Sequence, residues 1–247
     1  MTAWHEDALD LDGVPLSWSR RGQGSPGIIV LHGQLGDRAV VQPLVETVAD
    51  RRVVVPDLRG RGRTVCREVG LHTWERYVTD VKCILDHLEL ESVVVAGVSF
   101  GTGLAVATAL THPDRVDALV LWASPYRGRR HGWSAGQRAI QGPLIEMAGR
   151  ALDQGAASVI AGEDPHTARR WNRHDPESIA AALVGIGWSQ PFDDLNDLGA
   201  ISVRTLVIAG SDALHDPELA NAYVGALPRG SAGQETPTVI ADFAATL

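Results

Sequence analysis

The sequence has few cysteines and no long apolar run. Cys66 and Cys83 are its two cysteines, and neither lies in a metal-ligand or Cys-x-x-Cys spacing. The simplest interpretation is a pair of reduced thiols in a cytoplasmic protein. The first residues, Met1 to Asp7, lack the basic start and apolar core of a signal peptide, so none is expected. No stretch is apolar for long enough to span a membrane.

Positive charge is also scarce. The chain has 22 Lys and Arg against 30 Asp and Glu, for a net charge of −8. The basic residues are scattered, which argues against nucleic acid or an anionic membrane as a partner. Arg127 to His131 is the one basic cluster, and it is either a solvated surface run or a site for an acidic group of a substrate. No cofactor-binding or metal-binding motif is present, so neither group is expected.

The 247 residues, 45% of them hydrophobic, suit one α/β domain with an insertion. Runs of β-branched and other apolar residues predict buried strands of a mostly parallel sheet at 27–31, 52–56, 93–98, 116–122 and 203–209. Residues 9–19, with Asp12-Gly13 at the centre, predict a β-hairpin. Helical patterns are found at 39–49, 73–88 with Thr73 as N-cap, 217–227 and 237–247.

The pattern changes between the strands at 116–122 and 203–209. Residues 124–196 are helical and separate two strands of one sheet, so we expect them to form a cap over a core made of 1–123 and 197–247. This segment carries Trp133, Trp171 and Trp188. The three tryptophans either line an apolar substrate pocket or pack within the cap.

A strand and a helix meet at Gly97-Val98-Ser99-Phe100-Gly101. A Gly-x-Ser-x-Gly set in this position is a nucleophile-elbow motif, in which a sharp turn strains the serine backbone and leaves little room for neighbouring side chains. The motif predicts an exposed Ser99 hydroxyl. It also directs the backbone N–H of Phe100 and the N-terminus of the helix toward the same space, where negative charge is stabilised.

A second loop follows the strand at 27–31, at His32-Gly33-Gln34. We expect its backbone, through the N–H of Gln34, to supply a second hydrogen-bond donor to the site, and the His32 side chain to brace the loop. The loop from Asp57 to Thr64 is rich in Gly and Arg but lacks the Lys-Ser/Thr pair of a P-loop. An ion pair between Asp57 and Arg59 is expected to hold it.

Together these features resemble the α/β-hydrolase family. The resemblance covers nearly the whole chain and includes Gly210-Ser211-Asp212. It implies that Ser99 is the nucleophile, that Gln34 and Phe100 are the oxyanion donors, and that Asp212 is the acid of a catalytic triad.

The family pattern also includes a further strand and a histidine after Pro228, followed by Glu-x-Pro. Glu235-Thr236-Pro237 is present, but Arg229 to Gln234 are too few for a strand of about 5–6 residues with its loops. Without a base, a serine hydroxyl is a poor nucleophile. Three explanations stay open. Residues carrying the histidine are missing within 230–234, which predicts a break in the backbone there; another histidine replaces it; or hydrolysis has been lost.

Four histidines are candidates for the replacement. His215 lies just beyond Asp212 and is the best placed; it is otherwise a loop histidine in the first turn of a helix. His131, His166 and His174 come from the cap.

Three hypotheses of function follow. The first is a serine hydrolase that acts on an ester, lactone or related acyl group of a small molecule or short peptide. The second is a non-hydrolytic enzyme, such as an epimerase, isomerase or cyclase in peptide or polyketide biosynthesis, in which Asp212 moves the proton. The third is a catalytically silent ligand-binding protein.

Overall fold

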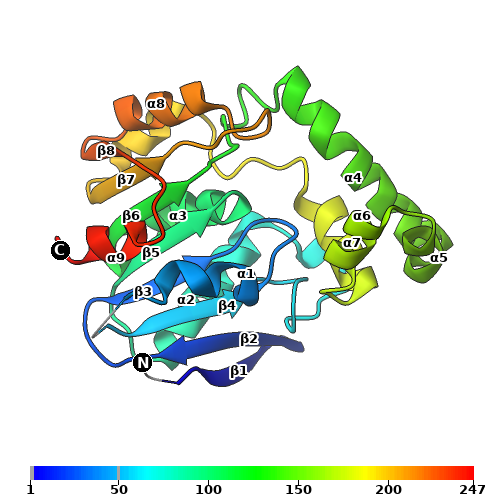
Figure 1. Cartoon of the computed structure of the whole chain (residues 1–247), viewed down its shortest axis with the longest axis horizontal. Coiled ribbons are helices and arrows are strands. Elements are labelled where there is room, and N and C mark those ends of the chain that lie inside the picture. The colour runs from blue at the N-terminus through cyan, green and yellow to red at the C-terminus, as the bar shows by residue number, and fades with distance from the viewer. Residues whose placement is uncertain (1–2, 49–50) are drawn as a thin grey trace.

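The computed structural model describes residues 3–48 and 51–247, and these form one twisted sheet flanked by helices (Figure 1). Its eight strands lie in the order β1-β2-β4-β3-β5-β6-β7-β8. β1 and β2, at one side of the sheet, pair in antiparallel fashion with each other, and β2 pairs in the same way with β4; the remaining pairs are parallel. The strands are β1 (His5–Leu11), β2 (Val14–Arg21), β3 (Gly27–Leu31), β4 (Val53–Asp57), β5 (Val93–Val98), β6 (Val116–Trp122), β7 (Arg204–Ile208) and β8 (Gly230–Gly233). The predicted mostly parallel α/β architecture and the hairpin are therefore confirmed.

Alternate residues of the central strands point to opposite faces of the sheet. In β3, Ile29 and Leu31 enter one apolar cluster, whereas Ile28 and Val30 enter the other. Because both faces are covered, the strands read as continuous apolar runs rather than as alternating patterns.

Helices cover the two faces. One face carries α2 (Trp74–His87), α3 (Phe100–Thr111) and α8 (Pro217–Ala226), and the other carries α1 (Arg38–Val41) and α9 (Val239–Ala244). Short 3-10 helices lie at Gln42–Val45, Val69–Leu71, Pro113–Arg115 and Leu195–Ala200. No helix in the described ranges combines the length and apolarity that a membrane crossing requires.

Two of the predicted helices can be compared in detail. Thr73 caps α2 as expected, because its side chain accepts a hydrogen bond from the N–H of Arg76. The helix predicted over 39–49 is instead a short α-helix followed by the 3-10 helix, in which Pro43 stands near the start. The predicted end at Ala49 lies outside the described residues.

Four α-helices lie between β6 and β7 and gather beside the sheet, at the right in Figure 1. They are α4 (Ala135–Gln154), α5 (Ala156–Ala161), α6 (Pro165–Trp171) and α7 (Pro176–Ile186). They share an apolar cluster that includes Met147, Ile160 and Trp171, and Leu35 of the loop after β3 also belongs to it. Ser134 and Gln137 close a capping box at the start of α4.

The expectation that no strand fits after Pro228 was wrong. All four residues of β8 pair in parallel with β7, from Thr205–Gly230 to Ile208–Gly233. The strand is shorter than a typical one, and the chain passes through it without a break into the turn before α9.

The predicted ion pair between Asp57 and Arg59 was also wrong. Arg59 instead bonds the two carboxylate oxygens of Asp80 on α2, at 2.5 and 2.9 Å. Asp57 accepts hydrogen bonds from the N–H groups of Arg38 and Arg63, at 2.9 and 3.0 Å. Asp80 and Arg38 come from other segments, so the local sequence did not reveal them, whereas Arg63 lies on the same loop as Asp57.

Candidate active site

Ser99 occupies a strained turn between β5 and α3. Its backbone has φ 51° and ψ −111°, and residues other than glycine rarely adopt such a positive φ. A Cβ on Gly97 would stand 2.3 Å from the carbonyl oxygen of Gly101, and one on Gly101 would stand 2.1 Å from the carbonyl oxygen of Leu31. Only glycine fits at either position, so the predicted elbow is present.

The Ser99 hydroxyl meets a histidine. Its Oγ lies 2.8 Å from Nε2 of His215, and Nδ1 of the same imidazole lies 2.9 Å from each carboxylate oxygen of Asp212. The structure thus brings together three residues that the sequence singled out. A base in contact with a hydroxyl, itself oriented by a carboxylate, is the arrangement that activates a serine.

Asp212 and His215 belong to one turn between β7 and α8. Oδ1 of Asp212 also accepts hydrogen bonds from the N–H groups of Leu214 and His215, at 2.9 and 3.0 Å. A Cβ on Gly210 would lie 2.3 Å from the Cβ of His215, so the His215 side chain packs against this glycine at its Cβ. The sequence Gly210-Ser-Asp-Ala-Leu-His215 therefore shapes the whole acid–base pair locally.

The carboxylate of Asp212 favours its charged form. Partial burial raises the pKa of Asp212, but the His215 side chain and the backbone N–H groups of His215 and Leu214 outweigh this, and the pKa is lowered overall. The Asp212 side chain is 60% exposed and that of His215 only 14%. Asp212 thus stays available as an acceptor that holds the imidazole in place.

The backbone N–H groups of Phe100 and Gln34 are oriented by the carbonyls of the residues before them, because the N–H and C=O of one peptide bond point in opposite directions. The Ser99 carbonyl accepts from the N–H and the hydroxyl of Thr102, at 2.9 and 2.6 Å, which turns the Phe100 N–H the opposite way. The Gly33 carbonyl accepts from Gly36 at 3.0 Å and lies 2.8 Å from Nδ1 of His32.

The Gln34 N–H shares this second peptide and makes no hydrogen bond to another described residue. A Cβ on Gly33 would lie 3.5 Å from the Cβ of Ser99, so this loop passes directly beside the serine. The geometry suits a pair of donors to an oxygen next to Ser99.

His32 braces this loop, as predicted. Its Nε2 accepts a hydrogen bond from the N–H of Leu58 at 3.0 Å, while Nδ1 faces the Gly33 carbonyl. Burial, with smaller effects from neighbouring charges, lowers the pKa of His32 to about 3. A neutral imidazole therefore links two loops of the core.

A cavity of about 600 Å³ opens over Ser99 and His215. Its other walls come from the loop at Gln34 and from α4 and α6, with Ile140, Gln141, Leu144 and Arg170 among the lining residues. Gln141 donates to the Gln34 side-chain oxygen at 2.6 Å and so bridges the loop and α4. No cluster of three or more potential metal ligands is found among the described residues.

Two arginines line the cavity, and they differ in their partners. Arg173 forms a two-point ion pair with Asp37, at 2.7 and 3.0 Å. Arg170 makes no ion pair or side-chain hydrogen bond within the described part of the chain. Partial burial lowers the pKa of Arg170, with no acidic neighbour to oppose it. The cavity wall therefore carries one positive charge that is not neutralised.

The three tryptophans of residues 124–196 are absent from the lining of this cavity, and their contacts favour the packing alternative. Trp171 is fully buried in the cluster shared by α4–α7. The indole of Trp133 packs on Tyr126 and donates to the Trp188 carbonyl at 3.0 Å. Trp188 is 43% exposed.

The cap histidines also lie elsewhere. His131 faces Asp194 at 3.3 Å, His166 is exposed on α6, and His174 accepts from the Gly62 N–H at 3.0 Å. Among the described histidines, only His215 has a contact with Ser99.

Gln137 was not identified from the sequence. It is buried on α4, and its amide donates to the carbonyls of Pro125 and Leu214, at 2.7 and 3.0 Å. The second carbonyl belongs to the peptide bond that leads into His215. The one signal in the sequence was Ser134 three residues earlier, which indicates a helix start but not this second role.

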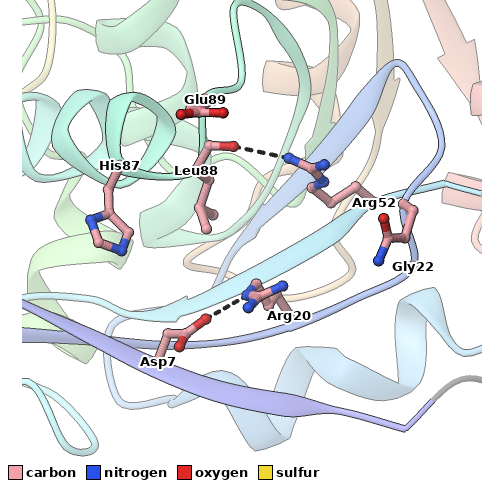
Figure 2. Close-up of a pocket in the computed structure, with 8 residues that line it drawn as sticks. Asp7, Arg20, Gly22, Arg52, His87, Leu88 and Glu89 are labelled. Atoms are coloured by element: carbon pink, nitrogen blue, oxygen red, sulfur yellow. Dashed lines mark hydrogen bonds and ion pairs between the residues drawn. The ribbon is translucent and has the colours of Figure 1, made fainter.

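A second cavity, of about 310 Å³, lies near the ends of β1 and β2 (Figure 2). Its two arginines are engaged: Arg20 pairs with Asp7, and Arg52 donates to the Leu88 carbonyl at 2.9 Å. Arg52 precedes β4, whereas Ser99 follows β5, so this cavity is at the opposite end of the parallel strands. It is not part of the Ser99 site.

Comparison with known proteins shows the family of the chain. Residues 26–144 match the family described as the alpha/beta hydrolase fold. The chain is 34% identical over 205 residues to a 2-hydroxymuconate semialdehyde hydrolase of Pseudomonas putida, covering 78% of this chain and 72% of that protein. It is 38% identical over 116 residues to a 2-hydroxy-6-oxo-2,4-heptadienoate hydrolase of Pseudomonas putida strain F1, covering 44% of this chain and 41% of that protein.

Several curated relatives are matched over only about two fifths of their own length. Among solved structures, the enol-lactonase from Burkholderia xenovorans LB400 superposes with a TM-score of 0.74 at 19% identity, covering 97% of this chain and 95% of that one. At that identity the likeness concerns the fold.

Proposed function

The chain belongs to the α/β-hydrolase family, and we propose that it is a serine hydrolase of esterase or lactonase type. The contact of Ser99 with His215, in a cavity lined in part by α4 and α6, carries this proposal. The named hydrolase activities of its relatives support it. The two free thiols, one of them buried, fit a cytoplasmic location.

The proposed reaction has two halves. Ser99 Oγ attacks the acyl carbon as its proton passes to Nε2 of His215, and the carbonyl electrons move to oxygen. The N–H groups of Gln34 and Phe100 hold this oxyanion, with Gly33 leaving room for it. The intermediate collapses, and the departing alkoxide takes the proton from His215. Water then hydrolyses the acyl-serine by the same sequence, in which Asp212 keeps the imidazole oriented.

The substrate we propose is a small organic acyl compound that carries a carboxylate. Arg170 supplies the reason, because a guanidinium without a partner matches a carboxylate in shape and charge. The apolar side chains of Ile140 and Leu144 line the cavity with it and suit a short hydrocarbon spacer.

An activated aryl ester tests the catalytic proposal. We expect a burst of aryl alcohol equal to the enzyme concentration, and labelling by a fluorophosphonate probe. Both are lost in Ser99→Ala. Turnover that survives Ser99→Ala and is lost in Asp212→Asn would indicate the non-hydrolytic alternative. Ligand-dependent thermal stabilisation without turnover would indicate a binding protein.

Paired esters test the carboxylate. Aryl monoesters of dicarboxylic acids are compared with neutral aryl alkanoates of equal chain length. Arg170→Gln should lower kcat/KM for the charged series by about 10-fold, or 1.4 kcal/mol, and leave the neutral series unchanged. Arg169→Gln is the matched control, because Arg169 is exposed on the same helix and does not line the cavity. Equal losses in both series would contradict this assignment.

A further inference from the structure

The side chain of Arg61 lies between the two loops that carry the proposed oxyanion donors. It is fully buried. Its Nε donates to the Gln34 carbonyl at 2.8 Å, and its guanidinium carbon stands 4.5 Å from the centroid of the Phe100 ring. One cation therefore contacts both residues whose N–H groups face the site.

The remaining contacts of Arg61 are neutral. Nη1 donates to the Arg59 carbonyl at 2.8 Å and to the Tyr77 hydroxyl at 2.5 Å. Nη2 is buried and makes no hydrogen bond within the described ranges. No ion pair of the described residues includes Arg61, and the nearby carboxylate of Asp80 is bonded by Arg59.

A cation that is buried without a carboxylate destabilises the folded protein unless other groups stabilise it. Filling this space alone would need only an apolar side chain of similar length. We propose that Arg61 is a positioning residue of the oxyanion hole, an inference that rests on the proposed hydrolase function. It fixes the Gln34 carbonyl and the Phe100 ring, and its positive charge favours the state in which the neighbouring oxygen becomes negative.

The charge of Arg61 also affects neighbouring imidazoles. Burial is the main cause that lowers the pKa of His72 and of His174 to about 4, and the charge of Arg61 comes next. The same charge contributes to the low pKa of His32, after burial. Its field therefore acts across the region beneath the proposed oxyanion hole, where water does not screen it.

Arg61→Met tests the inference, because methionine fills the space without charge or donors. Active sites are first counted by the aryl-ester burst, and kcat and KM are then measured per active site. We expect kcat to fall by about 10–100-fold with KM little changed. An aryl boronic acid, which forms an anionic tetrahedral adduct with an active serine, should bind more weakly by a similar factor. Arg61→Lys should recover part of both losses.

Arg63→Met is the matched control. Arg63 lies on the same loop, but its side chain is 65% exposed and pairs with Glu6. It should leave kcat and boronate affinity unchanged. An unchanged kcat per active site in Arg61→Met would overturn the inference, as would a lower kcat with unchanged boronate affinity.

If Arg61→Met does not fold, Arg61→Lys decides. Lysine keeps the charge but cannot reproduce the hydrogen bonds to both Gln34 and Tyr77, so boronate affinity equal to that of Arg63→Lys would overturn the inference. The two proposals fail differently. A wild-type protein with neither burst nor labelling contradicts the hydrolase function itself, whereas an active wild type with an equally active Arg61→Met contradicts only the role of Arg61.

Discussion

Asp212 and His215, three residues apart on one turn, face each other with both carboxylate oxygens 2.9 Å from the imidazole Nδ1. The family resemblance placed the histidine after a later strand, on a separate loop. Here the proposed acid and base depend on the same few backbone angles between β7 and α8. Anything that changes this turn should affect both residues together.

His215→Gln tests the proposed base. A glutamine amide cannot take the proton of Ser99, so we expect kcat for an aryl ester to fall by roughly 10³-fold or more. The fold should be retained, because the imidazole mainly contacts Ser99 and its own turn. The measurement is steady-state hydrolysis with circular dichroism as the check on folding.

His131→Gln is the control for that change. His131 is exposed and faces Asp194 rather than Ser99. It should hydrolyse the ester at the wild-type rate. A larger loss in His131→Gln than in His215→Gln would show that the base comes from the cap.

Gly210→Ala tests the shape of the turn. Its new Cβ would stand 2.3 Å from the Cβ of His215 and 2.8 Å from the His215 carbonyl oxygen, so the turn must shift. We expect a fluorophosphonate probe to label Ser99 about 10-fold or more slowly, since small displacements weaken proton transfer. Gly225→Ala, which places its Cβ in open space, should label at the wild-type rate. Equal labelling of both variants would contradict a local origin of the acid–base geometry.

The central strands of the sheet could be predicted because each is an uninterrupted apolar run in the local sequence. Val53 to Val55 and Val93 to Val95 are buried on both faces and are therefore apolar without interruption. β8 gives no such signal. Its sequence, Gly-Ser-Ala-Gly, has no β-branched residue, and it is a strand only because the exposed edge of β7 pairs with it. A strand that forms only because its backbone groups pair with a neighbouring strand cannot be recognised from the pattern of its side chains.

The site was predictable to the extent that its geometry is local. Ser99 lies in a motif whose glycines are required because a Cβ there would stand 2.3 Å or less from a backbone oxygen, and Asp212 lies on the turn that follows β7. The roles of Arg61, Gln137 and Arg170 depend on which segments meet in space. Arg61 reaches Gln34, 27 residues away, and Gln137 reaches Leu214, 77 residues away. Contacts of this kind have no signature in a single sequence.

Gln137→Ala tests how α4 supports the site. The change removes the donor to two carbonyls, Pro125 and Leu214, at a residue that is 1% exposed. We expect the free energy of unfolding to fall by about 1–3 kcal/mol, and kcat to fall severalfold because the peptide before His215 loses its partner. Chemical denaturation and ester hydrolysis measure the two effects. Gln154→Ala, at the exposed end of the same helix, should change neither. If the free energy of unfolding falls by the expected amount while kcat is unchanged, Gln137 stabilises the fold but does not position His215.

Three buried neutral imidazoles should make the protein sensitive to acid. The pKa of His32 is lowered to about 3, and those of His72 and His174 to about 4, in each case mainly by burial. In the unfolded chain these groups take up protons near pH 6.5, so the unfolded state binds more protons below that pH. Their contribution to stability is therefore complete above pH 6.5. It is lost as the pH falls toward 4, by roughly 1.4 kcal/mol per pH unit for each histidine.

His174→Gln separates one of these contributions. His174 lies between α6 and α7; its Nδ1 accepts from the Gly62 N–H at 3.0 Å, and its Nε2 lies 3.4 Å from the Leu35 carbonyl. A glutamine can offer an acceptor and a donor without titrating. Urea denaturation at pH 7.0, 6.0, 5.0 and 4.5 should therefore give a dependence on pH that is shallower than wild type by about 1.4 kcal/mol per pH unit. His166→Gln, at an exposed position on α6, should keep the wild-type slope. An unchanged slope in His174→Gln would mean that the pKa of His174 is the same in the folded and unfolded protein, which would contradict its lowering by burial.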